Sequence, residues 1–193
     1  MNNLSAPRFS ESSREILLDI AWSSIRHGLE QNTPLKLNPK DYPADLQVHS
    51  ACFVTLSLQG ELRGCIGHLE AQMPLAADVA ENAFSAAFRD PRFPPLSERE
   101  LKKLEIHISI LTPSEPMQFD SEADLLGKIK PGIDGLILVE GRHRGTFLPA
   151  VWESLPDPDS FLRHLKQKAG LPDDYWSDTL EVFRYETESF PEP

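Results

Sequence analysis

The spacing of apolar side chains changes between helical and strand periods several times along the chain. Residues 11–30 place apolar side chains every three or four positions, which predicts a helix with one buried face. Residues 47–58 and 62–69 are typical of two strands joined by a short turn, and so predict a hairpin. Residues 105–112 alternate strictly, which places His107 on the face opposite to the isoleucines.

The remaining segments predict further helices and a second hairpin. Residues 74–88 contain six alanines in 15 positions, so another backbone can pack closely against this predicted helix. The sequence "SERE" at 97–100 is a capping box that opens a short helix. We also expect a hairpin around 134–149, a helix over 157–169 and a strand at 179–186. Because hairpins mix with helices without regular βαβ alternation, the pattern indicates an α+β fold, an antiparallel sheet flanked by helices.

Composition narrows the function classes. The chain has 193 residues, of which 40% are hydrophobic, enough to build one domain or two tightly joined lobes. A formal net charge of −11 argues against binding to extended nucleic acid, because an acidic protein repels polyphosphate. No stretch approaches the run of about 20 apolar residues that spans a membrane, and the N-terminus lacks a signal pattern. We therefore expect a cytoplasmic protein that does not bind membranes.

The two cysteines, Cys52 and Cys65, suit a reducing compartment. With the turn of the first hairpin near residue 59, Cys65 would lie opposite Val54 and Cys52 opposite Gly67. The two thiols would then be out of register, although they occupy adjacent strands. The chain has no Cys-x-x-Cys pair and its six histidines are scattered, so we expect no metal site and no cofactor.

The segment "LRGCIG" places Cys65 between two glycines and close to an arginine. Glycines inside a strand often mark a bulge or a close approach of another backbone. A cation beside a thiol lowers the thiol pKa and favours the nucleophilic thiolate, which is the role we assign to Arg63. In the structural alternative, Cys65 is a small buried hydrophobe and Gly64 and Gly67 serve packing.

Two histidines are candidates for proton transfer with this thiol. His68 is three positions from Cys65, and in an unbroken strand the two side chains would point to opposite faces. His107, on a neighbouring strand, is a candidate at least as good.

The loop "RDPRFPPL" at 89–96 presents Asp90 and Arg92 beside Phe93 on a backbone stiffened by proline. A rigid loop presents charges with little entropic loss and so suits a binding site. An ion pair that only braces the turn is an equal alternative. The basic cluster at 142–144 could meet phosphate or carboxylates, or could be a solvated hairpin tip.

Seven short motifs occur along the chain in an order that resembles the AMMECR domain family. They are "LRGCIG", "DPRFPPL", "SILTP", "GIDGLIL", "TFLPAVW", "KAGL" and "FRYE". The resemblance covers about residues 10–187 and implies a single AMMECR-type domain, with flexible ends at 1–9 and 188–193. It implies an α+β fold with a larger lobe that contains both termini, a smaller lobe, and a groove between them.

The resemblance also implies site residues and partners. The signature core is residues 63–67; Asp90, Arg92 and Phe93 match the second motif, and Thr146, Leu148 and Pro149 match the third. The family is associated with a radical-SAM protein and a Memo-like protein, within the AmmeMemoRadiSam group. The segment "ESLPDPDSF" is shorter and richer in proline than the family pattern.

Two functions of different classes follow from these residues. In the first, the protein is a cysteine-dependent enzyme in a modification pathway with those partners. Its catalytic residues would be Cys65, His68 and His107, and its ligand-binding residues Arg63, Gly64, Gly67, Asp90, Arg92 and Thr146. In the second, the protein is a non-catalytic binding or scaffold module whose groove holds a partner protein, a peptide or a small anionic ligand.

Overall fold

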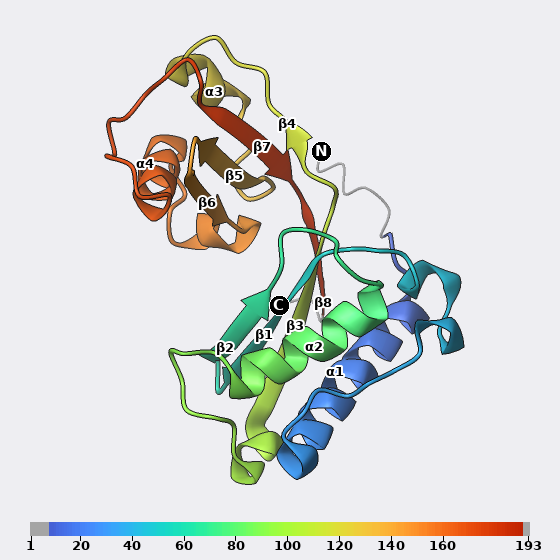
Figure 1. The fold of residues 1–193 in the computed structure, drawn as a ribbon. Coiled ribbons are helices and arrows are strands. Elements are labelled where there is room, and N and C mark those ends of the chain that lie inside the picture. Colours follow the sequence, from blue (N-terminus) through green and yellow to red (C-terminus); the bar gives the residue numbers. More distant parts are fainter. Residues whose placement is uncertain (1–7, 191–193) are drawn as a thin grey trace. The chain divides into compact units, whose positions relative to one another are not determined.

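The chain folds into two compact units, each with its own sheet and helices (Figure 1). The computed structural model describes residues 8–190. The first unit comprises the chain up to Leu111 together with the segment from Glu188 on, and the second comprises Thr112–Thr187. Hairpins and helices occur in both units, which confirms the predicted α+β fold.

Each unit is built on a four-stranded sheet. The strand order is β2-β1-β3-β8 in the first unit and β4-β7-β5-β6 in the second. The strands are β1 (Cys52–Leu58), β2 (Glu61–Gly67), β3 (Leu104–Leu111), β4 (Glu115–Pro116), β5 (Gly135–Glu140), β6 (His143–Phe147), β7 (Glu181–Tyr185) and β8 (Thr187–Phe190). Every pairing whose register is described is antiparallel.

The helices expected at 11–30, 74–88 and 157–169 are present, with ends within one residue of those expected, whereas the helix Glu122–Lys128 was not predicted. The α-helices are α1 (Glu11–Gln31), α2 (Leu75–Phe88), α3 (Glu122–Lys128) and α4 (Pro158–Lys168). The short 3₁₀ helices are η1 (Pro39–Asp41), η2 (Ala44–Leu46), η3 (Glu98–Lys103) and η4 (Pro149–Glu153). Within residues 8–190, no helix combines the length and the apolar character that a membrane span requires.

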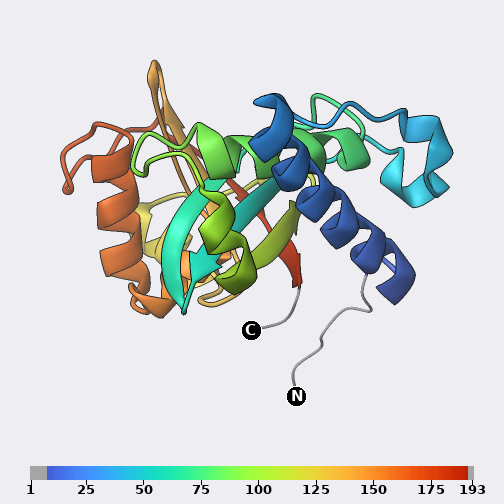
Figure 2. The same cartoon turned by 90° about the horizontal axis from the view of Figure 1, so that it is seen from below.

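Helices α1 and α2 pack side by side against one face of the first sheet (Figures 1 and 2). The buried residues of this core include Leu17 and Ile25 of α1, Val79 of α2 and Ile108 of β3. The alanines of α2 let β2 come close, because a Cβ added to Gly64 would lie under 3.0 Å from the backbone of Ala86. The close approach expected from the alanine-rich sequence is therefore confirmed.

The β1–β2 hairpin contains a bulge that the sequence did not reveal. Ser57 pairs with Leu62, but Leu56 pairs with Gly64, so Arg63 is the extra residue. Cys65 consequently lies opposite Thr55, not opposite Val54 as the unbroken register predicted.

The same shift affects the other end of the hairpin. Gly67 lies opposite Phe53, and the backbone carbonyl of Cys52 accepts a hydrogen bond from the amide of His68. The predicted partner of Cys52, Gly67, is thus wrong by one residue. The two thiols are out of register, as expected, and both cysteines are free.

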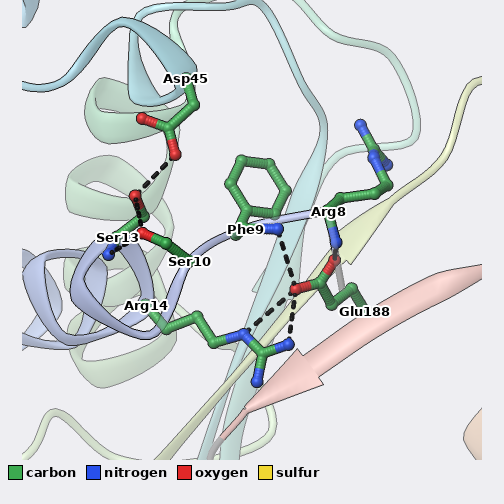
Figure 3. Close-up of polar contacts among 7 residues, drawn as sticks. All are labelled: Arg8, Phe9, Ser10, Ser13, Arg14, Asp45 and Glu188. Carbon is green, nitrogen blue, oxygen red and sulfur yellow. Dashed lines mark hydrogen bonds and ion pairs between the residues drawn. The ribbon is translucent and has the colours of Figure 1, made fainter. Parts of the chain in front are cut away.

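The described residues near the chain ends belong to the first unit and pack against each other (Figure 3). The Glu188 carboxylate accepts hydrogen bonds from the backbone amides of Arg8 and Phe9 and from the Arg14 guanidinium, at 2.8–3.3 Å. Phe9 and Phe190 are buried in the core of this unit. The flexible ends expected at 1–9 and 188–193 stay a prediction, of which residues 1–7 and 191–193 lie outside the described residues.

The second unit has its own core between the sheet and α4. The rings of Trp152 and Phe161 stack at a centroid distance of 3.7 Å. The buried ammonium of Lys166 binds the Glu122 carboxylate and so joins α4 to α3.

Candidate functional site

Cys65 lies on the outer strand β2, and both of its backbone polar groups are held by side chains of the loop after α2. The amide of Cys65 donates to Asp90 Oδ2 at 2.9 Å, and the carbonyl of Cys65 accepts from Arg92 Nη2 at 3.3 Å. These groups stand where a further strand would pair with β2. The loop side chains therefore saturate the open sheet edge at this position, and they also fix the backbone of the cysteine.

The sulfur of Cys65 lies on the sheet face opposite to α1 and α2. Thr55 Oγ1 donates to Cys65 Sγ at 3.2 Å, and the side chain of Cys65 is half-buried. His107 pairs with Thr55 on the other side of β1. Because side chains of one register row share a face, Cys65, Thr55 and His107 form a row across three strands.

Asp90 and Arg92 form a bidentate ion pair. Arg92 Nε and Nη2 donate to the two Asp90 oxygens at 2.9 and 2.7 Å, and the Arg92 amide donates to Oδ1 at 3.1 Å. The hydrogen bonds from the Arg92 side chain, and secondarily from the amides of Cys65 and Arg92, hold the pKa of Asp90 well below its usual range, although burial opposes them. The carboxylate is thus ionised at neutral pH and fully occupied by donors.

Arg63 does not approach the thiol through its guanidinium. Its Nε donates to Glu100 Oε1 at 2.7 Å and its Nη2 to the carbonyl of Pro94 at 2.9 Å. The hydrogen bond from Arg63, then those from Ser97, lower the pKa of Glu100 to about 2. The predicted capping box is present, and its glutamate is also the partner of Arg63.

Phe93 contributes an aromatic contact between the two arginines of the region. Its ring centroid lies 5.8 Å from the guanidinium carbon of Arg63 and 5.5 Å from that of Arg92. The ring stabilises both cations through its face. The "DPRF" loop and the "RGC" strand therefore form one interlocked structure.

Gly64 and Gly67 have structural explanations. A Cβ at Gly64 would collide with the backbone of Ala86, and a Cβ at Gly67 would come closer than 3.0 Å to the carbonyl of Cys52 and the ring of Phe53. Both positions need glycine for close backbone packing. This accounts for the glycines, while their predicted role in ligand binding stays a prediction.

His68 lies just beyond β2 and turns to the helix side of the hairpin. Its Nδ1 is 3.1 Å from Oδ1 of Asp78, a buried carboxylate of α2. The structure thus brings His68 to Asp78 and places it on the opposite face from the Cys65 sulfur. A role for His68 as the base of Cys65 finds no support in this geometry.

Thr146 belongs to the second unit, where it is part of a local network. Its hydroxyl donates to the carbonyl of Leu136 at 2.9 Å and forms a 3.1 Å hydrogen bond with the hydroxyl of Tyr185. Burial raises the pKa of Tyr185 to about 12, so this phenol is neutral at ordinary pH. A ligand-binding role for Thr146, and a groove between the lobes, stay predictions.

Among residues 8–190, no group of three or more His, Cys, Asp or Glu side chains is arranged to hold a metal ion. A cleft of about 220 Å³ lies in the second unit, and its lining includes Pro116 of β4 and Glu181 and Phe183 of β7. None of the predicted site residues lines that cleft.

The arrangement can therefore present one partly accessible sulfur from a fixed backbone. Thr55 and Glu100, which contact the sulfur and the arginine, were not among the residues predicted from the sequence. The alternation in the first strand does place Thr55 on the outward face, but its contact with the sulfur depends on the bulge. Asp78, the partner of His68, was not among the predicted site residues either.

These features define an α+β protein of two units with a cysteine clamped at the edge of its first sheet. The chain belongs to the AMMECR1 family, whose model matches residues 18–190, and the predicted family is confirmed. A protein of Methanothermobacter thermautotrophicus is 39% identical over 189 residues, covering 95% of this chain and 96% of that protein. Protein MJ0810 of Methanocaldococcus jannaschii is 41% identical over 165 residues, with 81% and 80% covered.

A solved structure is similar along most of the chain. The uncharacterized protein PH0010 of Pyrococcus horikoshii matches with a TM-score of 0.82 and 34% sequence identity, covering 91% of this chain and 89% of that one. The shared fold extends to both units.

Proposed function

We infer that the protein is a cysteine-dependent enzyme that modifies a small molecule or protein, with Cys65 as the reacting group. The supporting observation is that the ion pair of Arg92 with the buried Asp90 holds the amide and the carbonyl of Cys65, while the sulfur stays half-buried on the face away from the helical core. A reacting atom needs such a fixed position, because misplacement slows reaction.

The thiol chemistry that this geometry supports is group transfer. The sulfur forms a bond to the electrophilic atom of the donor, the leaving group departs with its electron pair, and the thiol proton passes to a base. Thr55 donates a hydrogen bond to the sulfur and so holds the reacting atom in place. His107, in the same row, is the proton acceptor when a bound substrate or water bridges the intervening strand.

Alkylation kinetics test this proposal. Iodoacetamide should modify Cys65 in the folded protein at neutral pH faster than it modifies N-acetylcysteine, because only the thiolate reacts. Mass spectrometry of the digested protein separates Cys65 from Cys52. A rate for Cys65 no faster than that of the free thiol would contradict thiolate chemistry.

A pair of variants links that reactivity to the geometry. Thr55→Val removes the donor to the sulfur and should slow alkylation by about tenfold, the value of one hydrogen bond to a charged group. Ser57→Ala, two residues along the same face of β1, is the matched control and should leave the rate unchanged. Equal rates for both variants would mean that the Thr55 hydroxyl does not act on the sulfur.

A non-catalytic binding module is the second candidate, and one specific observation favours it. The charged groups expected to activate the thiol are already paired, Arg63 with Glu100 and Arg92 with Asp90. Among residues 8–190, no imidazole or amine forms a hydrogen bond with the Cys65 sulfur. Such a site can present a rigid surface without chemistry.

Partner binding discriminates between the two candidates. We propose radical-SAM and Memo-like proteins as the partners, on the strength of the sequence resemblance. In a co-purification assay, Cys65→Ser should still bind these partners. It should no longer support formation of the modified small molecule or protein. If the folded variant keeps both, the binding module is the better description.

A further inference from the structure

A second cluster of polar side chains lies on the helix side of the β1–β2 hairpin. Its centre is Asp78 of α2, which is 1% exposed. Asp78 Oδ2 accepts three hydrogen bonds at 3.0–3.1 Å, from the amide and the thiol of Cys52 and from Asn82 Nδ2. Its other oxygen, Oδ1, binds His68 Nδ1 at 3.1 Å.

Both oxygens of the buried Asp78 carboxylate are in contact with groups that can donate hydrogen bonds. An ionised carboxylate is very unfavourable in a protein interior unless donors surround it, and here all the groups in contact can donate. Burial and the neighbouring Asp78 charge raise the pKa of the Cys52 thiol well above its usual value. The thiol therefore stays protonated and serves as a donor to Asp78, not as a nucleophile.

The contact with Asp78 determines which nitrogen of His68 carries the hydrogen. Because a carboxylate oxygen only accepts, Nδ1 of neutral His68 must donate, and Nε2 then presents a lone pair. The side chain of His68 is 39% exposed, while its carboxylate partner is 2% exposed. Within the described part of the chain, nothing forms a hydrogen bond with Nε2.

We propose that His68 and Asp78 form a proton-transfer centre that is separate from the Cys65 site. Nε2 of His68 accepts a proton from water or from the hydroxyl of a bound small molecule, whose oxygen keeps the electron pair and becomes the nucleophile. The Asp78 carboxylate stabilises the imidazolium that forms. Cys52 and Asn82 are positioning residues, since they act only through Asp78.

This centre goes beyond the proposed function, because it uses neither the sulfur of Cys65 nor His107. A purely structural role is the competing explanation: the pair would only fasten the segment after β2 to α2. Both roles need the hydrogen bond, so the test must read proton transfer itself.

The hydrolysis rate of 4-nitrophenyl acetate measures this proton transfer. The oxygen of water bonds to the acetyl carbon, 4-nitrophenolate leaves with the electron pair, and the water proton goes to Nε2. The assay uses the full chain with Cys65→Ser, so failure here is separable from failure of the thiol proposal. Adding His68→Gln, whose amide can still donate to Asp78, should lower the rate about a hundredfold, and Asp78→Asn at least about tenfold.

His164→Gln is the matched control. His164 is exposed and its Nδ1 contacts a backbone carbonyl at 2.8 Å, so it has the accessibility without the carboxylate. Its loss should leave hydrolysis unchanged. Equal effects of His68→Gln and His164→Gln would overturn the proposal.

A measurement on the unmodified protein covers the case in which variants at Asp78 fail to fold. Nitrogen-15 NMR of the imidazoles should show His68 with its hydrogen on Nδ1. A hydrogen on Nε2 of neutral His68 would overturn the proposal, because that nitrogen could not then accept a proton.

Discussion

Replacing Asp90 by asparagine tests the clamp that holds Cys65. Both carboxylate oxygens accept two hydrogen bonds each: Oδ1 from the amide and Nε of Arg92, and Oδ2 from the amide of Cys65 and Nη2 of Arg92. Asparagine has a single acceptor oxygen, so in either orientation its amide group faces two donors. Two of the four hydrogen bonds are lost, and the two donors that made them face the NH2 group of asparagine without an acceptor.

The expected loss of unfolding free energy follows from those bonds. A hydrogen bond to a charged group contributes about 1.5–3 kcal/mol, which for two bonds gives an upper limit of about 6 kcal/mol. The Arg92 side chain is 52% exposed, so water can replace part of the hydrogen bonding that Arg92 loses, and the cost falls below this limit. We therefore expect Asp90→Asn to lower the unfolding free energy by about 2–4 kcal/mol at pH 7.

The effect should depend on pH. The pKa of Asp90 in the folded protein is lowered, chiefly by the hydrogen bond from Arg92, so its unfolded form binds a proton first as the pH falls. The stabilisation is fully present above the ordinary aspartate pKa of about 4 and is lost as the pH falls from there toward the folded value. The difference between the native protein and Asp90→Asn should therefore shrink in acid.

Urea unfolding followed by circular dichroism, at pH 7, 5 and 3, measures the difference. Glu81→Gln is the matched control. Glu81 lies on α2 and pairs with Arg89 at the C-terminal end of that helix, but both side chains are substantially exposed. Its effect should stay within about 0.5 kcal/mol. Equal losses for the two variants at pH 7, or a loss for Asp90→Asn that does not shrink from pH 5 to pH 3, would refute the reasoning.

Three further predictions follow from packing and burial. Gly64→Ala should lower the unfolding free energy by about 1–3 kcal/mol in urea unfolding, because the added Cβ meets the backbone of α2. Gly127→Ala, with open space around the added Cβ, should raise it by about 0.5–1 kcal/mol. A change of the same sign for both variants would contradict this account. Glu188→Ala should cost about 1–2 kcal/mol and speed hydrogen exchange of the Phe9 amide, and unchanged exchange would mean that Glu188 does not hold it. Ellman's reagent should reach Cys52 only after unfolding, and rapid native labelling there would show that the buried thiol opens.

The long periodic elements could be predicted from the sequence because their signals are local. The apolar face of α1 and the alternation in β3 each depend on residues within one segment. The capping box at Ser97 is likewise a contact between residues three positions apart. Strand β4 has only two residues and carries no periodic pattern, so it was not predicted.

The site depended more on contacts between distant residues. The "RGC" and "DPRF" motifs were identified as chemically notable, but their direct bonds to each other were not predicted. Arg63 was expected beside the thiol, whereas the bulge directs it to Glu100, which is 37 positions away. Bulge formation depends on how both strands pair and on what packs behind them, which one segment does not encode.

By itself, the amino-acid sequence determined the α+β class, most elements and the family, because backbone period, capping and motif order are local properties. Only the tertiary structure decided which charges are paired, which face each histidine occupies, and that β8 brings Glu188 to the start of α1. The physical reason is that a polar side chain takes whichever partner folding places within about 3 Å, and sequence separation does not limit that choice.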